Sequence, residues 1–346
     1  MIRVFMLVFL LTFHFLGDAQ KVSLKVVNEK LKRGQVPTCE DVGFKEYKVF
    51  ANNDTVIFYT YQKPNSNPSS IYLTLPGSNA EAIYTYHKDT DSAYWFSSLT
   101  SFDFSYLPDN YLLVIVAKPG FGFFGNGDSD TIPSLYWNKT SLQDRVTRAD
   151  IAIKYVKKNI IKKPAKAVIF GYSEGFYVGA KLATVNKTIT HLGIGGGGGY
   201  IDFYDFVLTN QKALIKGEIK ADTAIQNNEK IISVLRQIMS KPNSTNFRYG
   251  YTYKRWASFA EPPIQNLVKV NIPIFQIHGG NDESTAIENA YVVPIEFARL
   301  NKNNLTFKVY PNSDHSLIEH KADGSEISHW NEMMKDFFNW VTAHVK

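Results

Sequence analysis

Apolar residues along this chain fall into short unbroken runs, and between these runs apolar positions recur at helical spacing. The segments "YLLVIVAKPG" (111–120), "AKAVIFG" (165–171) and "IPIFQIHGG" (272–280) are nearly continuous apolar runs. Runs of this kind are typical of strands that are buried on both faces of a parallel sheet. The pattern predicts further strands at 44–51, 54–63, 70–77, 189–196 and 305–313.

The stretches between the strands have the periodicity of amphipathic helices. We predict helices at 141–160, 175–185, 285–301 and 326–345, and a short, charged, partly helical lead-in at 20–40. Strands that alternate with helices imply an α/β fold with a mostly parallel, eight-stranded sheet flanked by helices. Asn52-Asn53 alone separates the first two strands, which is a hairpin signal and predicts an antiparallel edge.

One region breaks this alternation. Residues 200–266 contain helical pieces such as "NNEKIISVLRQIMS" and the aromatic cluster "FRYGYTYKRWASFAEPP", but no strong strand. We interpret the region as a helical cap inserted between two parts of one core, 20–199 and 267–346, over one end of the sheet. The glycine run "GIGGGGGY" (193–200) precedes it, either as a flexible lead-in or as space beside the site described below.

The N-terminus resembles a secretory signal peptide over residues 1–19. Arg3 is followed by the apolar stretch "VFMLVFLLTFHFL" and by the small residues Gly17 and Ala19. The alternative is an uncleaved anchor, but the apolar run is short for a membrane-spanning helix. We therefore expect a secreted or periplasmic protein with no stable membrane anchor. Cys39 is the only cysteine, so an intramolecular disulfide is excluded.

Composition and charge exclude some classes of function. The chain has 346 residues and a net charge of +6, with no dense Lys/Arg tract, so no nucleic-acid partner is predicted. The positive charge mildly disfavours a strongly cationic substrate. No Lys-Ser/Thr pair follows the glycine run, and no His/Asp/Glu cluster has metal-ligand spacing, so we expect no cofactor and no metal. The oligomeric state does not follow from the sequence.

The candidate chemistry begins in "AVIFGYSEGFYVGAKLA" (167–183), where Ser173 stands between two glycines at a strand-to-helix transition. A nucleophilic serine has to be exposed on a sharp, strained turn, and Gly171 and Gly175 allow neighbouring elements to pass closely. The backbone amide of the next residue, Glu174, then points at the developing oxyanion. The five-residue pattern alone is weak, and its place between a buried strand and a helix gives it weight.

A base and an acid follow in the order expected for such a site. His315, in the loop after the last strand, is the candidate base, ahead of His87, His278, His320 and His329. Asp282 follows a buried strand and a Gly-Gly turn, and it is the candidate acid that orients the imidazole. Glu283 is the nearest rival, and Asp314 is rated lower because neighbouring side chains in an extended loop project apart.

The second oxyanion donor is expected in the loop after the strand at 70–77. There Pro76-Gly77 forms a turn that presents the amide of Ser78, or otherwise that of Asn79. The alternative is a Pro-Gly turn with no catalytic role.

With these residues in place, the chain resembles the α/β-hydrolase superfamily over residues 44–346, in its secreted esterase and serine-peptidase-like branches. The resemblance maps the nucleophile, acid and base onto Ser173, Asp282 and His315, and the oxyanion donors onto Glu174 and Ser78. "KPGFGFFG" (118–125) resembles the loop that lines the pocket in relatives. Pro76-Gly77 replaces the usual His-Gly before the first donor, so the identity of that donor stays open.

The leading hypothesis is a secreted serine hydrolase that cleaves a small carboxylic ester through an acyl-enzyme. A second is a serine exopeptidase acting on short peptides, which needs an acid such as Glu218 or Glu229 in the cap to hold the substrate amine. A third hypothesis is a binding protein that has kept the fold and lost catalysis. The presence of all three residues, Ser173, Asp282 and His315, argues against it.

Overall fold

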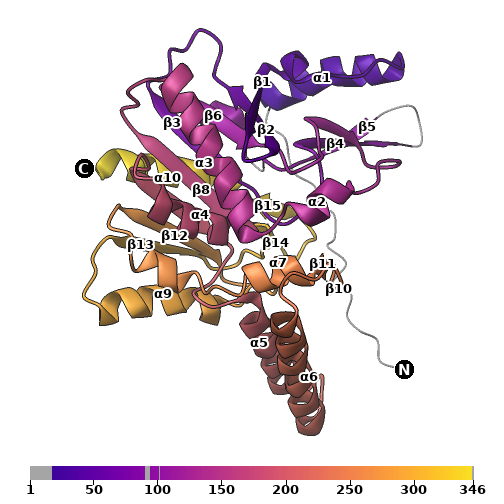
Figure 1. Cartoon of the computed structure of the whole chain (residues 1–346), viewed down its shortest axis with the longest axis vertical. Coiled ribbons are helices and arrows are strands. Elements are labelled where there is room, and N and C mark those ends of the chain that lie inside the picture. The colour runs from indigo at the N-terminus through magenta and orange to yellow at the C-terminus, as the bar shows by residue number, and fades with distance from the viewer. Residues whose placement is uncertain (1–17, 90–93, 101, 345–346) are drawn as a thin grey trace.

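A central sheet of eight strands organises the chain (Figure 1). The computed structural model describes residues 18–89, 94–100 and 102–344. The strands lie in the order β1-β2-β6-β3-β8-β9-β12-β13. Their bounds are β1 Phe44–Ala51, β2 Asp54–Tyr61, β3 Ser70–Leu75, β6 Tyr111–Val116, β8 Ala167–Tyr172, β9 His191–Gly195, β12 Ile274–Gly279 and β13 Leu305–Tyr310. All eight predicted strands are present, within a few residues of their predicted ends.

The antiparallel edge is also confirmed. β1 pairs antiparallel with β2, and β2 pairs antiparallel with β6, whereas every other neighbouring pair in the sheet is parallel. Asn52 and Asn53 make the hairpin turn with φ values of 53° and 55°. Asparagine adopts this left-handed conformation more readily than most residues, so the sequence suits the turn.

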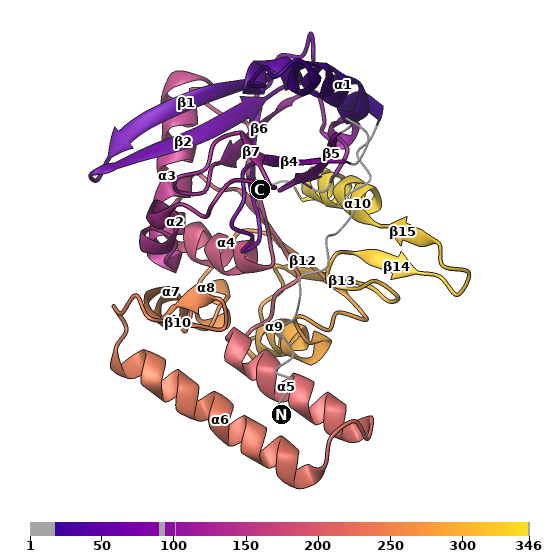
Figure 2. The ribbon, with the colours of Figure 1, turned by 90° about the vertical axis from the view of Figure 1, so that its right-hand side faces the viewer.

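Helices cover both faces of the sheet (Figure 2). The main ones are α1 Asp18–Lys32, α3 Leu142–Asn159, α4 Glu174–Val185, α9 Ile287–Arg299 and α10 Trp330–Ala343. Alternate residues of one strand enter two separate cores: Tyr72 packs with α1 and α10, whereas Ile71 and Leu73 pack with α3, α4 and α9. This two-sided burial explains the continuous apolar runs in the sequence.

Two small sheets outside the segment between β9 and β12 were not predicted. Strands β4 Tyr84–Lys88, β5 Tyr94–Ser98 and β7 Phe124–Asn126 form a three-stranded sheet. Strands β14 Ile318–His320 and β15 Glu326–Ser328 form a hairpin. The predicted helix 326–345 is therefore wrong at its start, because residues 326–328 pair with β14 and α10 begins at Trp330.

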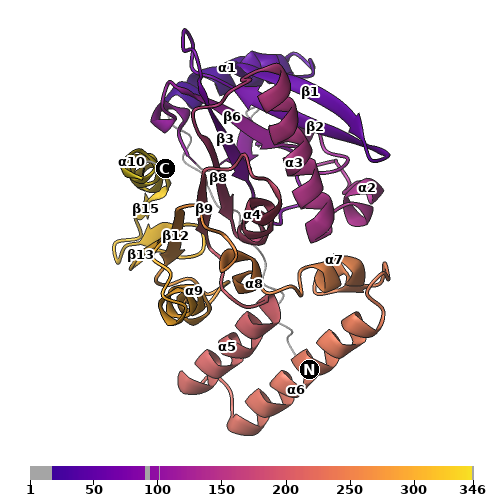
Figure 3. The same ribbon diagram turned by 60° about the vertical axis from the view of Figure 1, so that its left-hand side comes forward.

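Between β9 and β12 the chain forms mostly helices. They are α5 Asp202–Ile215, α6 Ala221–Ser240, α7 Tyr253–Ser258 and α8 Ile264–Leu267, with the short strands β10 Phe247–Arg248 and β11 Tyr251–Thr252. α5 and α6 lie side by side and extend away from the sheet (Figure 3). A small core of Phe203, Val234, Ile238 and Trp256 holds them to α7. The boundaries 200 and 266 of the insertion stay a prediction.

The glycine run is closely packed, which corrects its interpretation as a flexible lead-in. A β-carbon on Gly197 would lie 2.5 Å from the Phe176 ring, and one on Gly198 would lie 2.2 Å from the Asn289 side chain. Both distances are too short for any other residue. The glycines therefore let the chain pass between α4 and α9 on its way to α5.

The predicted signal peptide lies almost entirely outside the described residues, which begin at Asp18 in α1. Across the ranges that the structure does describe, no helix has both the length and the hydropathy needed to span a bilayer.

Candidate active site

Ser173 stands at the sharp turn between β8 and α4. Its φ of 56° and ψ of −121° are strained for a residue with a side chain. The Ser173 amide donates to the Gly195 carbonyl at 2.9 Å and so ties the turn to β9. A β-carbon on Gly171 would lie 2.0 Å from the Gly175 carbonyl oxygen, and one on Gly175 would lie 1.9 Å from that of Leu75. Both glycines are therefore required by close backbone contacts.

Gly175→Ala is expected to destabilise the protein by about 1–3 kcal/mol, because β3 or α4 has to move to admit the methyl group. Chemical denaturation measures the change. The matched control is Gly179→Ala in the same helix, where the added β-carbon meets Leu192 at 3.4 Å, an ordinary contact. Because alanine favours helix over glycine, this control should be neutral or stabilising. Equal destabilisation by both substitutions would contradict the close-contact argument.

Three side chains from separate parts of the sequence meet beside this turn. His315, in the loop between β13 and β14, has Nε2 3.1 Å from Ser173 Oγ and Nδ1 2.8 Å from Asp282 Oδ2. Asp282 follows β12 and is 2% exposed. Its Oδ1 accepts the amides of Ser284 and Thr285 at 2.9 and 2.8 Å, which fixes the carboxylate. The Tyr172 hydroxyl donates to the His315 carbonyl at 2.9 Å and holds the loop.

The rival acids lie elsewhere. Glu283 is exposed and faces Lys216. Asp314 accepts the amides of Ser316 and Ile318 and contacts His320. The structure thus brings Asp282, and neither rival, to the His315 ring.

The charge states of the pair suit proton transfer. Burial lowers the pKa of His315, but the Asp282 carboxylate beside Nδ1 outweighs burial and leaves this pKa above its ordinary value of 6.5. Burial acts against ionisation of Asp282, yet the facing imidazole keeps the pKa of this carboxyl below its usual range. Asp282 is therefore an acceptor at neutral pH, and His315 Nδ1 carries the hydrogen that it receives.

His278 is a second histidine beside the same carboxylate, and the sequence did not distinguish its role. It lies in β12, is fully buried, and has Nε2 3.6 Å from Asp282 Oδ2 and 3.0 Å from the Thr285 carbonyl. Burial lowers the pKa of His278. A neutral His278 donates to Thr285 and so supports the turn that positions Asp282.

Buried and partly buried side chains hold the carbonyls of the loop after β3. Arg145 Nη2 donates to the Pro76 carbonyl at 2.8 Å. Lys118 Nζ donates to the Gly77 carbonyl at 2.6 Å and also to the Asn79 carbonyl. The Tyr136 hydroxyl donates to the Ser78 carbonyl at 2.7 Å. In a trans peptide the N–H points opposite to the preceding C=O. The amides of residues 77–80 therefore point away from these donors. A β-carbon on Gly77 would lie 3.3 Å from Ser173 Cβ, so the loop passes directly beside the serine.

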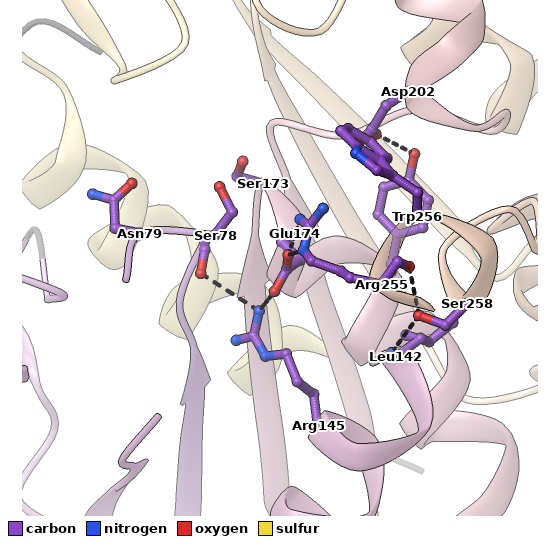
Figure 4. A network of polar contacts seen from close by, with 12 residues as sticks. Ser78, Asn79, Leu142, Arg145, Ser173, Glu174, Asp202, Arg255, Trp256 and Ser258 are labelled. Carbon is purple, nitrogen blue, oxygen red and sulfur yellow. Dashed lines mark hydrogen bonds and ion pairs between the residues drawn. The ribbon is translucent and has the colours of Figure 1, made fainter. Parts of the chain in front are cut away.

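A buried ionic cluster connects this loop to α4 and α7 (Figure 4). Glu174 directs its carboxylate to Arg145 of α3 and to Arg255 of α7, whose Nε donates at 2.8 Å. Burial acts against ionisation of Glu174, but the charges of Arg255 and Arg145 lower the pKa of Glu174 to about 2. Burial also lowers the pKa of Lys118 to about 7. The amide of Glu174 is the first of α4 and has no partner within the helix.

A cavity of about 370 Å³ opens beside the serine. Its lining contains Ser173, His315, Gly77 and Ser78, and it also contains residues of the small β5-β4-β7 sheet. Phe121 and Gly125 of the segment 118–125 are part of the lining, but no residue of 200–266 is. Glu218 and Glu229 are exposed and lie outside it. Among the described residues, no three His, Cys, Asp or Glu side chains are grouped to hold a metal ion.

Comparison with known proteins supports the fold. Residues 241–345 match the dienelactone hydrolase family. The structure is similar to a thermostable carboxyl esterase from Bacillus coagulans, with 16% identity, a TM-score of 0.53, and coverage of 87% of this chain and 98% of the esterase. It is also similar to an acylaminoacyl peptidase from Pyrococcus horikoshii, with 12% identity and a TM-score of 0.52. That match covers 86% of this chain but only 41% of the peptidase. No curated protein sequence matches this chain.

Proposed function

We propose that this chain, which has the α/β-hydrolase fold, is a serine hydrolase that cleaves small carboxylic esters. The observation that carries the proposal is the continuous hydrogen-bonded series from Ser173 Oγ through His315 to Asp282 at a strained turn. The signal-peptide pattern at 1–19 adds that the enzyme is secreted or periplasmic. The match to the dienelactone hydrolase family and the similarity to a carboxyl esterase agree with a hydrolase.

The hydrogen-bonded series supports a reaction in two halves. Ser173 Oγ attacks the ester carbonyl carbon and transfers its proton to His315 Nε2, and the carbonyl oxygen becomes an oxyanion. His315 then returns the proton to the leaving alcohol, and the C–O bond breaks to give an acyl-enzyme. Water, deprotonated by His315, attacks this acyl group in the second half. The proton returns to Ser173 and the carboxylic acid is released.

The buried cluster favours the charge that develops in these steps. We assign the amides of Glu174 and Ser78 as the oxyanion donors, since the first begins α4 and the second follows the glycine beside Ser173. Arg145 and Arg255 outnumber the single carboxylate of Glu174 behind this pair of donors, and Lys118, whose pKa burial lowers to about 7, adds positive charge when it is protonated. The surrounding field is therefore positive where negative charge forms, and the fixed carbonyls of the loop keep its amides in place.

Hydrolysis of p-nitrophenyl acetate and butyrate, beside a panel of aminoacyl-p-nitroanilides, tests the proposal. We expect turnover of the esters above that of the anilides. Faster turnover of the anilides than of the esters would support the exopeptidase alternative. The structural similarity to an acylaminoacyl peptidase is the reason for including the anilides. Absence of turnover on the whole panel favours the binding-protein alternative.

The rate is expected to depend on the protonation of His315. Only the neutral imidazole accepts the proton of Ser173, so kcat/KM should fall as the pH drops through the pKa of His315, which lies above 6.5 in the free enzyme. Asp282→Asn removes the charge that raises this pKa, so the midpoint should move to lower pH. Rates measured from pH 5 to 9 test both expectations. A flat profile between pH 5 and 8 contradicts the role of His315.

A further inference from the structure

The small β5-β4-β7 sheet has two chemically different faces. Tyr84, Tyr86 and Phe124 belong to or pack on the aromatic core. Thr85 pairs with Ser97 on one side and with Gly125 on the other, so these three residues share the opposite face. All three line the cavity that contains Ser173. The apolar face thus anchors the sheet, and the small polar face forms a wall of the cavity.

Two carboxylates lie in the same lining. Glu81 follows the loop after β3, and its carboxylate accepts hydrogen bonds from Asn79 Nδ2 at 2.8 Å and from Ser97 Oγ at 3.2 Å. Asp130 follows β7 and accepts the Asn126 amide at 2.6 Å through Oδ2. These donors are neutral. Within the described part of the chain no Lys or Arg contributes to the lining, and no salt bridge involves either carboxylate. This end of the cavity is therefore negative in a protein whose net charge is +6.

A buried hydroxyl between these groups is without a partner. Thr85 is 8% exposed, and its Oγ1 has no hydrogen-bond partner in the residues described. A β-carbon on Gly125 would lie 3.3 Å from Asp130 Oδ2 and 3.9 Å from Thr85 Oγ1, so these two oxygens flank the same glycine. A buried polar atom is normally satisfied, which makes this hydroxyl an available acceptor beside two carboxylates.

We propose that this wall of the cavity, formed by Glu81, Thr85 and Asp130, binds a protonated primary amine of the substrate. An ammonium has three N–H donors and no acceptor, which suits carboxylate oxygens and a hydroxyl acceptor. The inference rests on the proposed function and names its substrate class: esters, or amides, that carry an amine within reach of the scissile carbonyl. It reverses the expectation drawn from net charge, since local charges in a cavity decide which ligand binds there.

Two basic side chains lie near this wall of the cavity. Lys118 interacts electrostatically with Glu81, but its Nζ is engaged by the carbonyls of Gly77 and Asn79 behind the loop. His87 also lines the cavity, with Nδ1 3.3 Å from Asp128, which lies outside the lining. Neither group makes a contact with the two carboxylates that would neutralise them at the wall.

Inhibition of p-nitrophenyl acetate hydrolysis by three matched compounds tests the proposal: n-pentylammonium, 1-pentanol and pentanoate. We expect the inhibition constant of pentylammonium to be at least about tenfold lower than that of pentanol, with pentanoate weakest. The double variant Glu81→Gln/Asp130→Asn should reduce the preference for ammonium over pentanol at least about tenfold. Thr85→Val should reduce it by a smaller factor. Glu229→Gln, whose carboxylate lies outside the cavity, is the control and should leave the preference unchanged.

Equal inhibition by pentylammonium and pentanol overturns the proposal, as does a double variant that keeps the full preference. A loss of preference in Glu229→Gln assigns the amine to the helical insertion instead and also overturns it. Calorimetric titration of the full chain with pentylammonium and with pentanol separates this inference from the proposed function. Binding selective for ammonium in a protein without esterase activity contradicts the proposed function alone. Esterase activity without selective binding contradicts the amine site alone.

Discussion

Ser173→Ala is expected to lower kcat for p-nitrophenyl acetate by at least about 10⁴-fold while the protein stays folded. In the proposed mechanism, loss of Ser173 removes the acyl-enzyme route, and the oxyanion donors and substrate binding alone give only a small residual rate. Alanine has the same difficulty as serine with a φ of 56°, so the turn should not change. Steady-state kinetics measure the loss, and circular dichroism with thermal unfolding verifies the fold.

Ser173→Gly is the informative companion to this variant. Glycine adopts positive φ without strain, so it should unfold at a higher temperature than Ser173→Ala while being equally inactive. A higher stability for alanine would mean that the turn is unstrained. Retention of most of the ester hydrolysis by either variant would remove Ser173 from the reaction.

Glu174→Gln is expected to lower the free energy of unfolding by about 3–5 kcal/mol, because it leaves Arg145 and Arg255 buried without their counter-charge. The same substitution should reduce kcat by about 10²-fold, since Arg145 also holds the Pro76 carbonyl and so the oxyanion loop. Denaturant titration and ester kinetics measure the two effects. The backbone amide of residue 174 is retained in the variant, so the loss reports on the positioning of the loop.

The matched control for this prediction is Glu296→Gln. Glu296 pairs with Arg299 on the surface of α9, where solvent screens the interaction. We expect no measurable change in unfolding or in ester turnover. An effect of Glu174→Gln as small as that of the control would show that the buried cluster contributes neither stability nor loop geometry.

The sheet was predictable because burial on both faces leaves a strong signal. Each central strand packs alternate residues into two cores, so its sequence is apolar throughout, as in 111–116. The β5-β4-β7 sheet lacks this signal. Its strands have only three to five residues, and none of them is a continuous run of buried apolar residues. The hairpin of β14 and β15 was missed because its strands have three residues each and residues 326–328 are exposed.

The candidate site was predictable as far as chain order and strand ends define it. Ser173, Asp282 and His315 each follow a strand of the central sheet, and parallel strands bring these ends to one edge of the sheet. The partners of Glu174 were not predictable. Arg145 and Arg255 lie 29 and 81 residues away from it in the chain, and no sequence motif marks either arginine. For the exopeptidase alternative, the sequence pointed to Glu218 or Glu229 as the acid that holds a substrate amine. The carboxylates in the lining are instead Glu81 and Asp130, which lie between β3 and β8.

Covalent labelling tests most directly the central claim that Ser173 is an activated nucleophile. The full chain is treated with a fluorophosphonate, digested, and analysed by mass spectrometry. We predict one adduct, on the peptide that contains Ser173, which forms more slowly as His315 becomes protonated and is absent from Ser173→Ala. An unlabelled Ser173, or equal labelling of the Ser173→Ala variant at another residue, would contradict the account.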